Sequence, residues 1–166
     1  MPQVIVVMGV SGSGKTTTGA ALARRLGVPF ADADDFHPPA NIAKMAAGVP
    51  LDDDDRVPWL RAIGQWIAEH RDGGVVTCSA LKRSFRDGLR AAAPSARFLH
   101  LAGDPEVVRA RVAARSGHFM PVSLVASQYA ALEPLEPDEP GLVLDLSLPV
   151  DALVDAYLNA EEGNPS

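Results

Sequence analysis

The chain has 166 residues, of which 47% are hydrophobic, and these values fit one globular domain with its own core. Its formal net charge of −6 argues against a nucleic-acid or anionic-membrane partner, because such partners bind to broad basic surfaces. The single cysteine, Cys78, excludes an intrachain disulfide, and the N-terminal apolar run is too short for a signal peptide. We therefore expect a cytoplasmic protein with one domain over residues 1–160 and a flexible tail over residues 161–166.

The first feature along the chain is an apolar run followed by a glycine-rich loop. Residues 4–8 are mostly β-branched, which predicts a strand covered on both faces, as in a parallel sheet. Residues 9–16 read GVSGSGKT and match the pattern G-x-x-x-x-G-K-[ST] in full. A helix over residues 16–26 is expected to end before Gly27. This strand–loop–helix order favours a phosphate-binding loop over a glycine-rich turn that matches by chance.

The residues of this loop have separate expected roles. Its glycines allow backbone N–H groups to converge on phosphate oxygens at a helix N-terminus. Lys15 is the expected catalytic cation for the β- and γ-phosphates, and Thr16 offers a hydroxyl to Mg²⁺. An adenine nucleotide is favoured, because the chain has no N-K-x-D signature for guanine. The expected nucleotide-binding residues of the loop are Gly9, Val10, Ser11, Gly12, Ser13, Gly14, Lys15, Thr16 and Thr17.

A second strand is expected at residues 29–33, and an acidic segment follows it at the sheet edge where open α/β folds bind ligands. If this segment is extended, Asp32 and Asp34 point to the same side. Asp32 could then organise the water shell of Mg²⁺, while Asp34 takes a proton from an attacking hydroxyl. The alternative is a solvated cluster that caps a helix. His37 could bond an acceptor hydroxyl or cap the turn before two prolines.

Residues 50–59 read PLDDDDRVPW and contain four consecutive aspartates. In an extended chain alternate side chains face opposite ways, so at most half of this run can address one pocket. We expect Arg56 to be the functional residue of the stretch. Asp53 and Asp55 are expected to orient it or to cap a helix that starts at Pro58, and the other two aspartates are expected to be solvated.

The remaining elements continue the alternation of strands and helices. Trp59 and Trp66 fall on one helical stripe, which predicts core packing rather than a sugar-binding platform. The pattern predicts an α/β fold in which a five-stranded parallel sheet is flanked by helices with right-handed crossovers. The further expected strands are residues 75–78, 97–101 and 142–146, and the further expected helices are residues 41–47, 58–70, 84–92, 104–115, 122–132 and 150–158.

Three basic residues follow the third expected strand. Lys82, Arg83 and Arg86 cluster at the carboxyl end of that strand, which suggests an anionic acceptor. The alternative is an exposed basic helix face, which is common and is expected to account for one or two of the three. Lys82 or Arg83 is the preferred substrate ligand, and Arg86 is a weaker candidate.

Two more arginines precede a predicted lid segment. Arg111 and Arg115 are separated by one helical turn and precede the loop SGHFMP at residues 116–121. Arginines near a helix C-terminus can simply offset the helix dipole. We favour a lid, because closure would exclude water and bring guanidinium groups to the transferring phosphoryl group.

Together these segments resemble the gluconokinase family of small P-loop kinases, which phosphorylate D-gluconate at its 6-hydroxyl with ATP. The resemblance is carried by GVSGSGKTT, DADDFHPPANIAKMAAGVPLDDDDRVPWL, CSALKRSFRDGLR and GHFMPVSLVASQYAALEPLEPDE. It implies a nucleoside-monophosphate-kinase-like fold with a lid segment, Mg²⁺-ATP as the phosphoryl donor, D-gluconate as the acceptor and a homodimer. The chain lacks the G-G-G run that follows the third strand of shikimate kinases and the D-G-F-P-R motif of nucleotide kinases.

The resemblance also implies roles for particular residues. It puts ATP and Mg²⁺ at residues 9–16, with Asp34 as the candidate base. A kinase for another small hydroxy acid and a non-catalytic ATP-binding module are the alternative functions. The residues that it implies near gluconate are Asp34, His37, Arg56 and Lys82 or Arg83, and those that it implies at the lid are Arg111 and Arg115.

Overall fold

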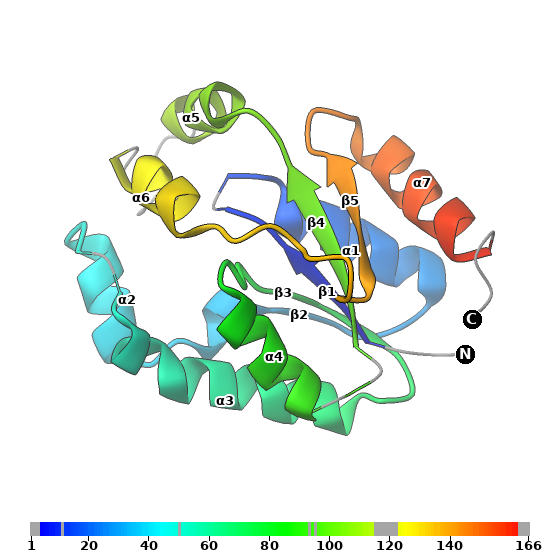
Figure 1. The fold of residues 1–166 in the computed structure, drawn as a ribbon, viewed down its shortest axis with the longest axis horizontal. Helices are drawn as coiled ribbons and strands as arrows, with labels where there is room; N and C mark the ends of the chain where they lie inside the picture. The colour runs from blue at the N-terminus through cyan, green and yellow to red at the C-terminus, as the bar shows by residue number, and fades with distance from the viewer. Residues whose placement is uncertain are drawn as a thin grey trace.

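The computed structural model describes residues 4–10, 12–49, 51–92, 94, 96–114 and 123–162, and five parallel strands within them form one sheet. The order of the strands across the sheet is β2-β3-β1-β4-β5, so the expected five-stranded parallel α/β fold is confirmed (Figure 1). The strands are β1 (Val4–Met8), β2 (Phe30–Asp32), β3 (Gly74–Thr77), β4 (Arg97–Ala102) and β5 (Gly141–Asp145). The helices are α1 (Lys15–Leu26), α2 (Pro39–Ala46), α3 (Asp53–Glu69), α4 (Arg83–Ala92), α5 (Pro105–Ala114), α6 (Ser123–Ala131) and α7 (Val150–Glu162), and a 3-10 turn, η1, spans Ala33–Phe36.

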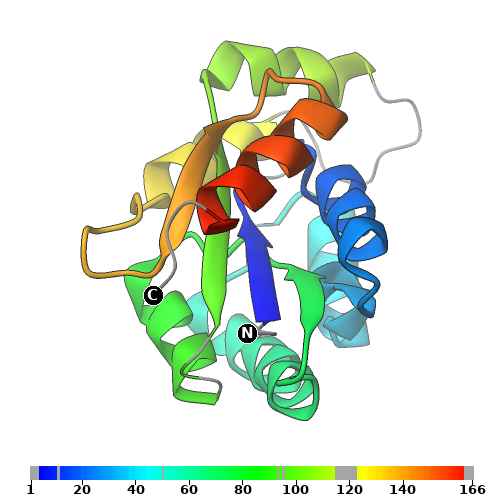
Figure 2. The ribbon, with the colours of Figure 1, turned by 90° about the vertical axis from the view of Figure 1, so that its right-hand side faces the viewer.

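Helices cover both faces of the sheet (Figures 1 and 2). Side chains of β1 alternate between two buried clusters, as the two-residue period of a strand requires. Ile5 and Val7 pack with residues of α1, α5 and α7, whereas Val4, Val6 and Met8 pack with residues of α3 and α4. Burial on both faces explains why this strand reads as a continuous apolar run.

The two tryptophans and the cysteine pack in the core. Trp59 is buried in the cluster under α3 and α4, and Trp66 packs against the same cluster. Cys78 is buried as well. Within the ranges given above, no helix is both long enough and apolar enough to cross a membrane.

Helix α3 begins earlier than expected, and this corrects the interpretation of the four aspartates. The run is not extended: Asp52 is the N-cap, and its side chain accepts from the Asp55 N–H at 2.7 Å. The Asp55 side chain accepts in return from the Asp52 N–H at 3.0 Å, which completes a capping box. Pro58 therefore lies inside α3, and Asp52, which we expected to be merely solvated, starts the helix.

The segment after β2 also differs from the prediction. Strand β2 ends at Asp32, and the chain then turns through η1, so Asp32 and Asp34 are not two residues of one extended strand. The argument that placed both side chains on the same side is therefore wrong. The side chain of Asp34 lies outside the described part of the structure, and its role as the base stays a prediction.

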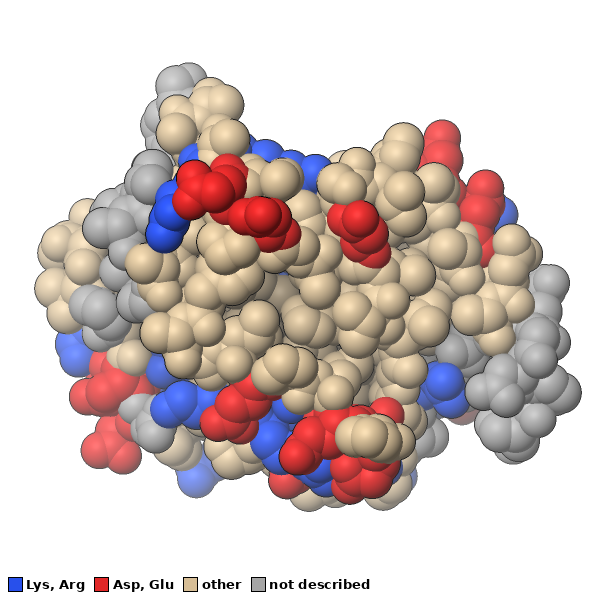
Figure 3. Space-filling view, turned by 45° about the horizontal axis from the view of Figure 1, so that its top comes forward, with Lys and Arg blue, Asp and Glu red and all other residues tan. Residues whose placement is uncertain are grey.

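Charged side chains of both signs lie beside one another on the surface. Figure 3 shows Lys and Arg atoms next to Asp and Glu atoms around a face formed mostly by other residues. Pairs of this kind include Arg25 with Asp155 at 3.0 Å and Arg109 with Glu106. Exposed pairs contribute little to stability, because water screens them.

Candidate active site

The glycine-rich loop connects β1 to α1 at the carboxyl edge of the sheet. Gly14 is the N-cap of α1 with a φ of 93°, a left-handed conformation that favours glycine. At Gly12 a Cβ atom would approach the Val112 side chain to 2.7 Å, so this position also lacks space for any side chain. Lys15 donates from Nζ to the Val10 carbonyl at 3.0 Å and thus folds over the loop. The backbone therefore has the form of an anion cradle at a helix N-terminus; Ser11 lies outside the described residues.

The two residues that were expected at the metal are brought together beside this cradle. Thr16 donates from Oγ1 to Asp32 Oδ2 at 2.9 Å, and Thr77 donates to Asp32 Oδ1 at 3.2 Å. The contacts join α1 to the ends of β2 and β3, which are far apart in sequence. A hydroxyl and a carboxylate are oxygen ligands of the kind that Mg²⁺ accepts, so these residues fit the ion. The sequence analysis did not anticipate Thr77.

Arg111 reaches the phosphate loop from α5. Its Nη2 donates to the Leu146 carbonyl at 2.8 Å, and its Nη1 donates to the Ser13 carbonyl at 3.4 Å. The guanidinium is therefore held beside the cradle, where it can contact a phosphate. Arg115 and the predicted lid loop at residues 116–121 lie outside the described residues, so their roles stay predictions.

Three of the predicted acceptor residues lie near one another at the same carboxyl edge of the sheet. Arg56 of α3 and Lys82 of the β3–α4 loop both contact the ring of Phe85, at 5.6 Å and 5.7 Å from its centroid. Burial, together with the charge of Arg56, lowers the pKa of His37 from 6.5 to about 4. These contacts put two cations and one neutral imidazole in the same region. Such a set suits a substrate with a carboxylate and hydroxyl groups.

The position of His37 is determined by its neighbours. Its ring stacks on Trp59 with the centroids 4.2 Å apart and the planes at 9°. Its Nδ1 lies 3.2 Å from Nδ2 of Asn41, which is buried in α2. Trp59 is itself anchored, because its indole N–H donates to the Ala33 carbonyl at 2.6 Å. No sequence signal identified Asn41, whose importance depends on where the histidine ring lies.

The aspartate run also connects α2 to α3. Lys44 donates to Asp55 at 2.7 Å, and Asn41 donates to the Asp55 carbonyl at 2.9 Å. The hydrogen bond from Lys44 holds the pKa of the Asp55 carboxyl below its usual value. Asp55 therefore joins the two helices that carry Asn41 and Arg56. The spacing of Asp52 and Asp55, which matches a capping box, was the sequence signal that could have revealed this arrangement.

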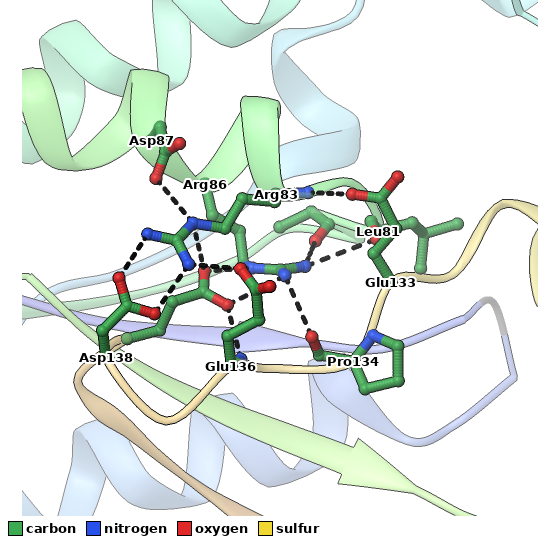
Figure 4. A network of polar contacts seen from close by, with 10 residues as sticks. Leu81, Arg83, Arg86, Asp87, Glu133, Pro134, Glu136 and Asp138 are labelled. Carbon is green, nitrogen blue, oxygen red and sulfur yellow. Dashed lines mark hydrogen bonds and ion pairs between the residues drawn. The ribbon is translucent and has the colours of Figure 1, made fainter.

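Arg86 is not a substrate ligand, contrary to the weaker of our expectations. It is fully buried, and it donates to Glu139 from Nε at 2.6 Å and from Nη2 at 3.0 Å (Figure 4). Its Nη1 donates to the carbonyls of Ala80 at 2.9 Å and Leu81 at 3.3 Å. Ala80 has a φ of 44°, which a non-glycine residue seldom adopts. Arg86 thus supports the strained loop that presents Lys82.

Arg83 takes part in the same network at the surface. It donates two hydrogen bonds of 2.8 Å to Asp138, one of 3.1 Å to Asp87, and one to Glu136 (Figure 4). Because carboxylates already bind this guanidinium on several sides, the structure favours Lys82 over Arg83 as the substrate ligand.

Comparisons with known proteins agree with this geometry. The family model described as shikimate kinase matches residues 11–129. The thermosensitive gluconokinase of Escherichia coli K12 is 46% identical over 141 residues, which cover 83% of this chain and 75% of that protein. The chain belongs to the gluconokinase family. The gluconokinase of Gluconobacter oxydans is 49% identical over 142 residues, which cover 84% of this chain and 80% of that protein.

Solved structures agree with the family assignment. A gluconokinase from Sinorhizobium meliloti superposes with a TM-score of 0.90 at 47% identity, covering 98% of this chain and 93% of that one. A shikimate kinase from Bacteroides thetaiotaomicron superposes with a TM-score of 0.67 at 22% identity, covering 96% and 98%, and this likeness concerns the fold alone. The chain is thus a kinase of the P-loop type, with the nucleotide-binding loop that this class uses.

Proposed function

We propose that the protein transfers the γ-phosphoryl group of ATP to the 6-hydroxyl of D-gluconate, giving 6-phospho-D-gluconate and ADP. The observation that carries this proposal is the gathering of His37, Arg56 and Lys82 at the sheet edge that also holds the phosphate cradle. A polyol with one carboxylate complements such a set, because cations can bind the acid and the imidazole can bond a hydroxyl. The identity with gluconokinases supports the choice of this acid.

The chain's own residues have distinct tasks in this reaction. The cradle and Lys15 hold the phosphates, and Arg111 supplies a second positive charge beside the loop. In the transfer, the substrate oxygen forms a bond to the γ-phosphorus while the bond from that phosphorus to the β–γ bridging oxygen breaks. The hydroxyl proton passes to a carboxylate, for which Asp34 is our candidate. Positioning and charge compensation account for most of the catalysis in such transfers.

A divalent ion completes the proposed site. Thr16 and Asp32 would hold Mg²⁺, which when bound offsets the negative charge of the phosphates. Arg115 and the segment 116–121 are proposed to close over the nucleotide. A homodimer and a cytoplasmic location are the remaining parts of the proposal. The buried Cys78 in a chain without another cysteine supports a reducing compartment.

A panel of sugar acids tests the function directly. The purified protein is incubated with ATP and Mg²⁺ and with D-gluconate, other aldonates or shikimate, and ADP formation is measured. We expect ADP formation that depends on D-gluconate, with little on the other acids. Turnover of another acid without turnover of gluconate would refute the proposed acceptor. Tight ATP binding without any phosphorylated product would refute an enzymatic role.

A further inference from the structure

We propose that Asn41 is a positioning residue that holds His37 in the neutral tautomer with its proton on Nε2. In this form His37 donates a hydrogen bond to an oxygen of the acceptor and does not act as the base. The identity of that oxygen rests on the proposed function, whereas the tautomer itself does not. Three observations carry the inference: the contacts of the Asn41 amide, the stacking of the imidazole ring on Trp59, and the nearby positive charge of Arg56.

The contacts of Asn41 determine which end of its amide carries hydrogen. Its Nδ2 lies 2.9 Å from the Asp55 carbonyl oxygen, which can only accept a hydrogen bond. The atom at that position must therefore be the NH₂ group, since an amide oxygen there would face another oxygen. The side chain is buried, so water does not compete for this contact.

The same NH₂ group determines the tautomer of His37. Asn41 Nδ2 lies 3.2 Å from His37 Nδ1, and an amide nitrogen has no lone pair with which to accept a hydrogen bond. Nδ1 must therefore be the acceptor, which leaves the ring proton on Nε2. A proton on Nδ1 would point at the amide hydrogens, so this contact disfavours both the other tautomer and the charged ring.

The surroundings of the ring favour the same neutral state. His37 stacks on Trp59 with a separation of 4.2 Å, and the indole is held by the Ala33 carbonyl, so the ring has little freedom to rotate. Burial and the positive charge of Arg56 lower the pKa of His37 to about 4. Near pH 7 the ring is therefore uncharged even though it lies beside cations.

This assignment has a chemical consequence for the acceptor site. A neutral ring whose Nδ1 lone pair is used by Asn41 and whose Nε2 carries a proton cannot take the proton of the attacking hydroxyl. The base must then be another group, for which Asp34 remains our candidate. His37 instead selects for a substrate that presents an oxygen acceptor, as a hydroxyl or a carboxylate group does.

Nitrogen NMR of the ¹⁵N-labelled protein, without substrate, tests the tautomer. We expect His37 to show a protonated Nε2 and an unprotonated Nδ1 at pH 7. In N41D the carboxylate can only accept, so Nδ1 should gain the proton and the pKa of His37 should rise. N159D adds the same charge at an exposed position of α7 and should leave the His37 signals unchanged. A proton on Nδ1 in the unmodified protein would overturn the proposal.

Steady-state kinetics test the role of the donor through two substitutions at His37. His37→Gln keeps an N–H donor at a similar reach from the backbone, whereas His37→Phe keeps a ring that can stack on Trp59 but has no donor. We expect His37→Phe to raise KM for gluconate by about tenfold with KM for ATP unchanged, and His37→Gln to recover most of that loss. Equal KM values for both variants would overturn the donor role. The NMR result does not depend on turnover, so the two hypotheses can fail separately.

Discussion

The donor side and the acceptor side of this site are built in different ways. The donor side is one contiguous stretch, residues 9–16, whose backbone supplies the cradle and whose lysine folds back on its own loop. The acceptor side takes side chains from the turn after η1, from α2, from α3 and from the β3–α4 loop, and these are held by contacts with other elements. Local sequence therefore specifies the first, and tertiary packing specifies the second.

The difference implies that the two sides can be impaired independently. Substitutions in the cradle should lower the rate of transfer, because its groups act on the phosphates. Substitutions among the supporting contacts of the acceptor side should weaken gluconate binding or the fold and leave ATP binding intact. The first three changes below test this separation and the fourth tests how pH affects the fold; they are given from the largest expected effect to the smallest.

Glu139→Gln should have the largest effect, and it should be an effect on stability. The substitution leaves the buried Arg86 guanidinium without its carboxylate, and breaking such a pair costs about 3–5 kcal/mol. Urea denaturation measures the free energy of unfolding. Asp87→Asn removes a carboxylate from an exposed contact of Arg83 and serves as the control. If both variants were equally stable, the buried pair would not support the β3–α4 loop that carries Lys82.

Lys15→Met should abolish most activity by acting on the donor side. Loss of a charge aimed at the developing negative charge typically lowers kcat by at least about a hundredfold. Lys82→Met removes the same ammonium group from the acceptor side and should mainly raise KM for gluconate. Steady-state kinetics with each substrate varied in turn measures both. If the two variants had the same kinetic defect, the separation of the two sides would be wrong.

Arg56→Lys should raise KM for gluconate by about tenfold, because an ammonium cannot replace a bidentate guanidinium. KM for ATP should stay the same, since Arg56 lies with His37 and Phe85 on the acceptor side. Equal weakening of both substrates would assign Arg56 a structural role. Circular dichroism of the variant would verify that α3 is intact.

The smallest expected effect concerns pH. Burial, with the charges of Arg86 and Lys15, lowers the pKa of His100 in β4 from 6.5 to about 4. As the pH falls from 6.5 to about 4, the unfolded chain gains a proton at this histidine and the folded chain does not, so the free energy of unfolding decreases. The lowered pKa of His37 also decreases the free energy of unfolding as the pH falls.

The paired carboxylates affect stability at a lower pH than the histidines do, so the two effects can be measured separately. The hydrogen bonds from Arg83 lower the pKa of Asp138 below its usual value of 3.8, so its contribution is lost only at more acidic pH. Urea unfolding at several pH values measures the dependence. His100→Gln should flatten the curve between pH 6.5 and about 4 and leave the acidic limb. An unchanged curve would mean that His100 does not couple folding to protonation.

The parts of this molecule that could be predicted are those that depend on neighbours in sequence. The strand–loop–helix from β1 to α1 was predicted because its apolar run, its motif and the glycine at which the helix ends follow one another in sequence. Thr16 and Asp32 were each expected at the metal, and they meet because the carboxyl ends of parallel strands share one edge of the sheet.

The errors arose where a residue's role depends on a distant partner or on two competing local signals. Arg86 resembled a substrate cation in sequence, because nothing near it shows that Glu139 neutralises it. The start of α3 was placed at Pro58, where the apolar helical stripe begins, although the capping box of Asp52 and Asp55 determines it. The role of Asn41 depends on the orientation of one amide and one ring, which no sequence pattern encodes.

The pairing of Arg86 with Glu139 also bears on the order in which the chain becomes ordered. The two residues are 53 positions apart, whereas Lys15 and the Val10 carbonyl are 5 apart. Contacts between distant residues form late, because a longer loop must first be closed. We therefore expect the turn at Ala80 to stay open to amide hydrogen exchange after the β1–α1 unit has become protected. During synthesis, a nascent chain would complete its phosphate loop well before the ribosome had added Glu139, on which the β3–α4 loop depends.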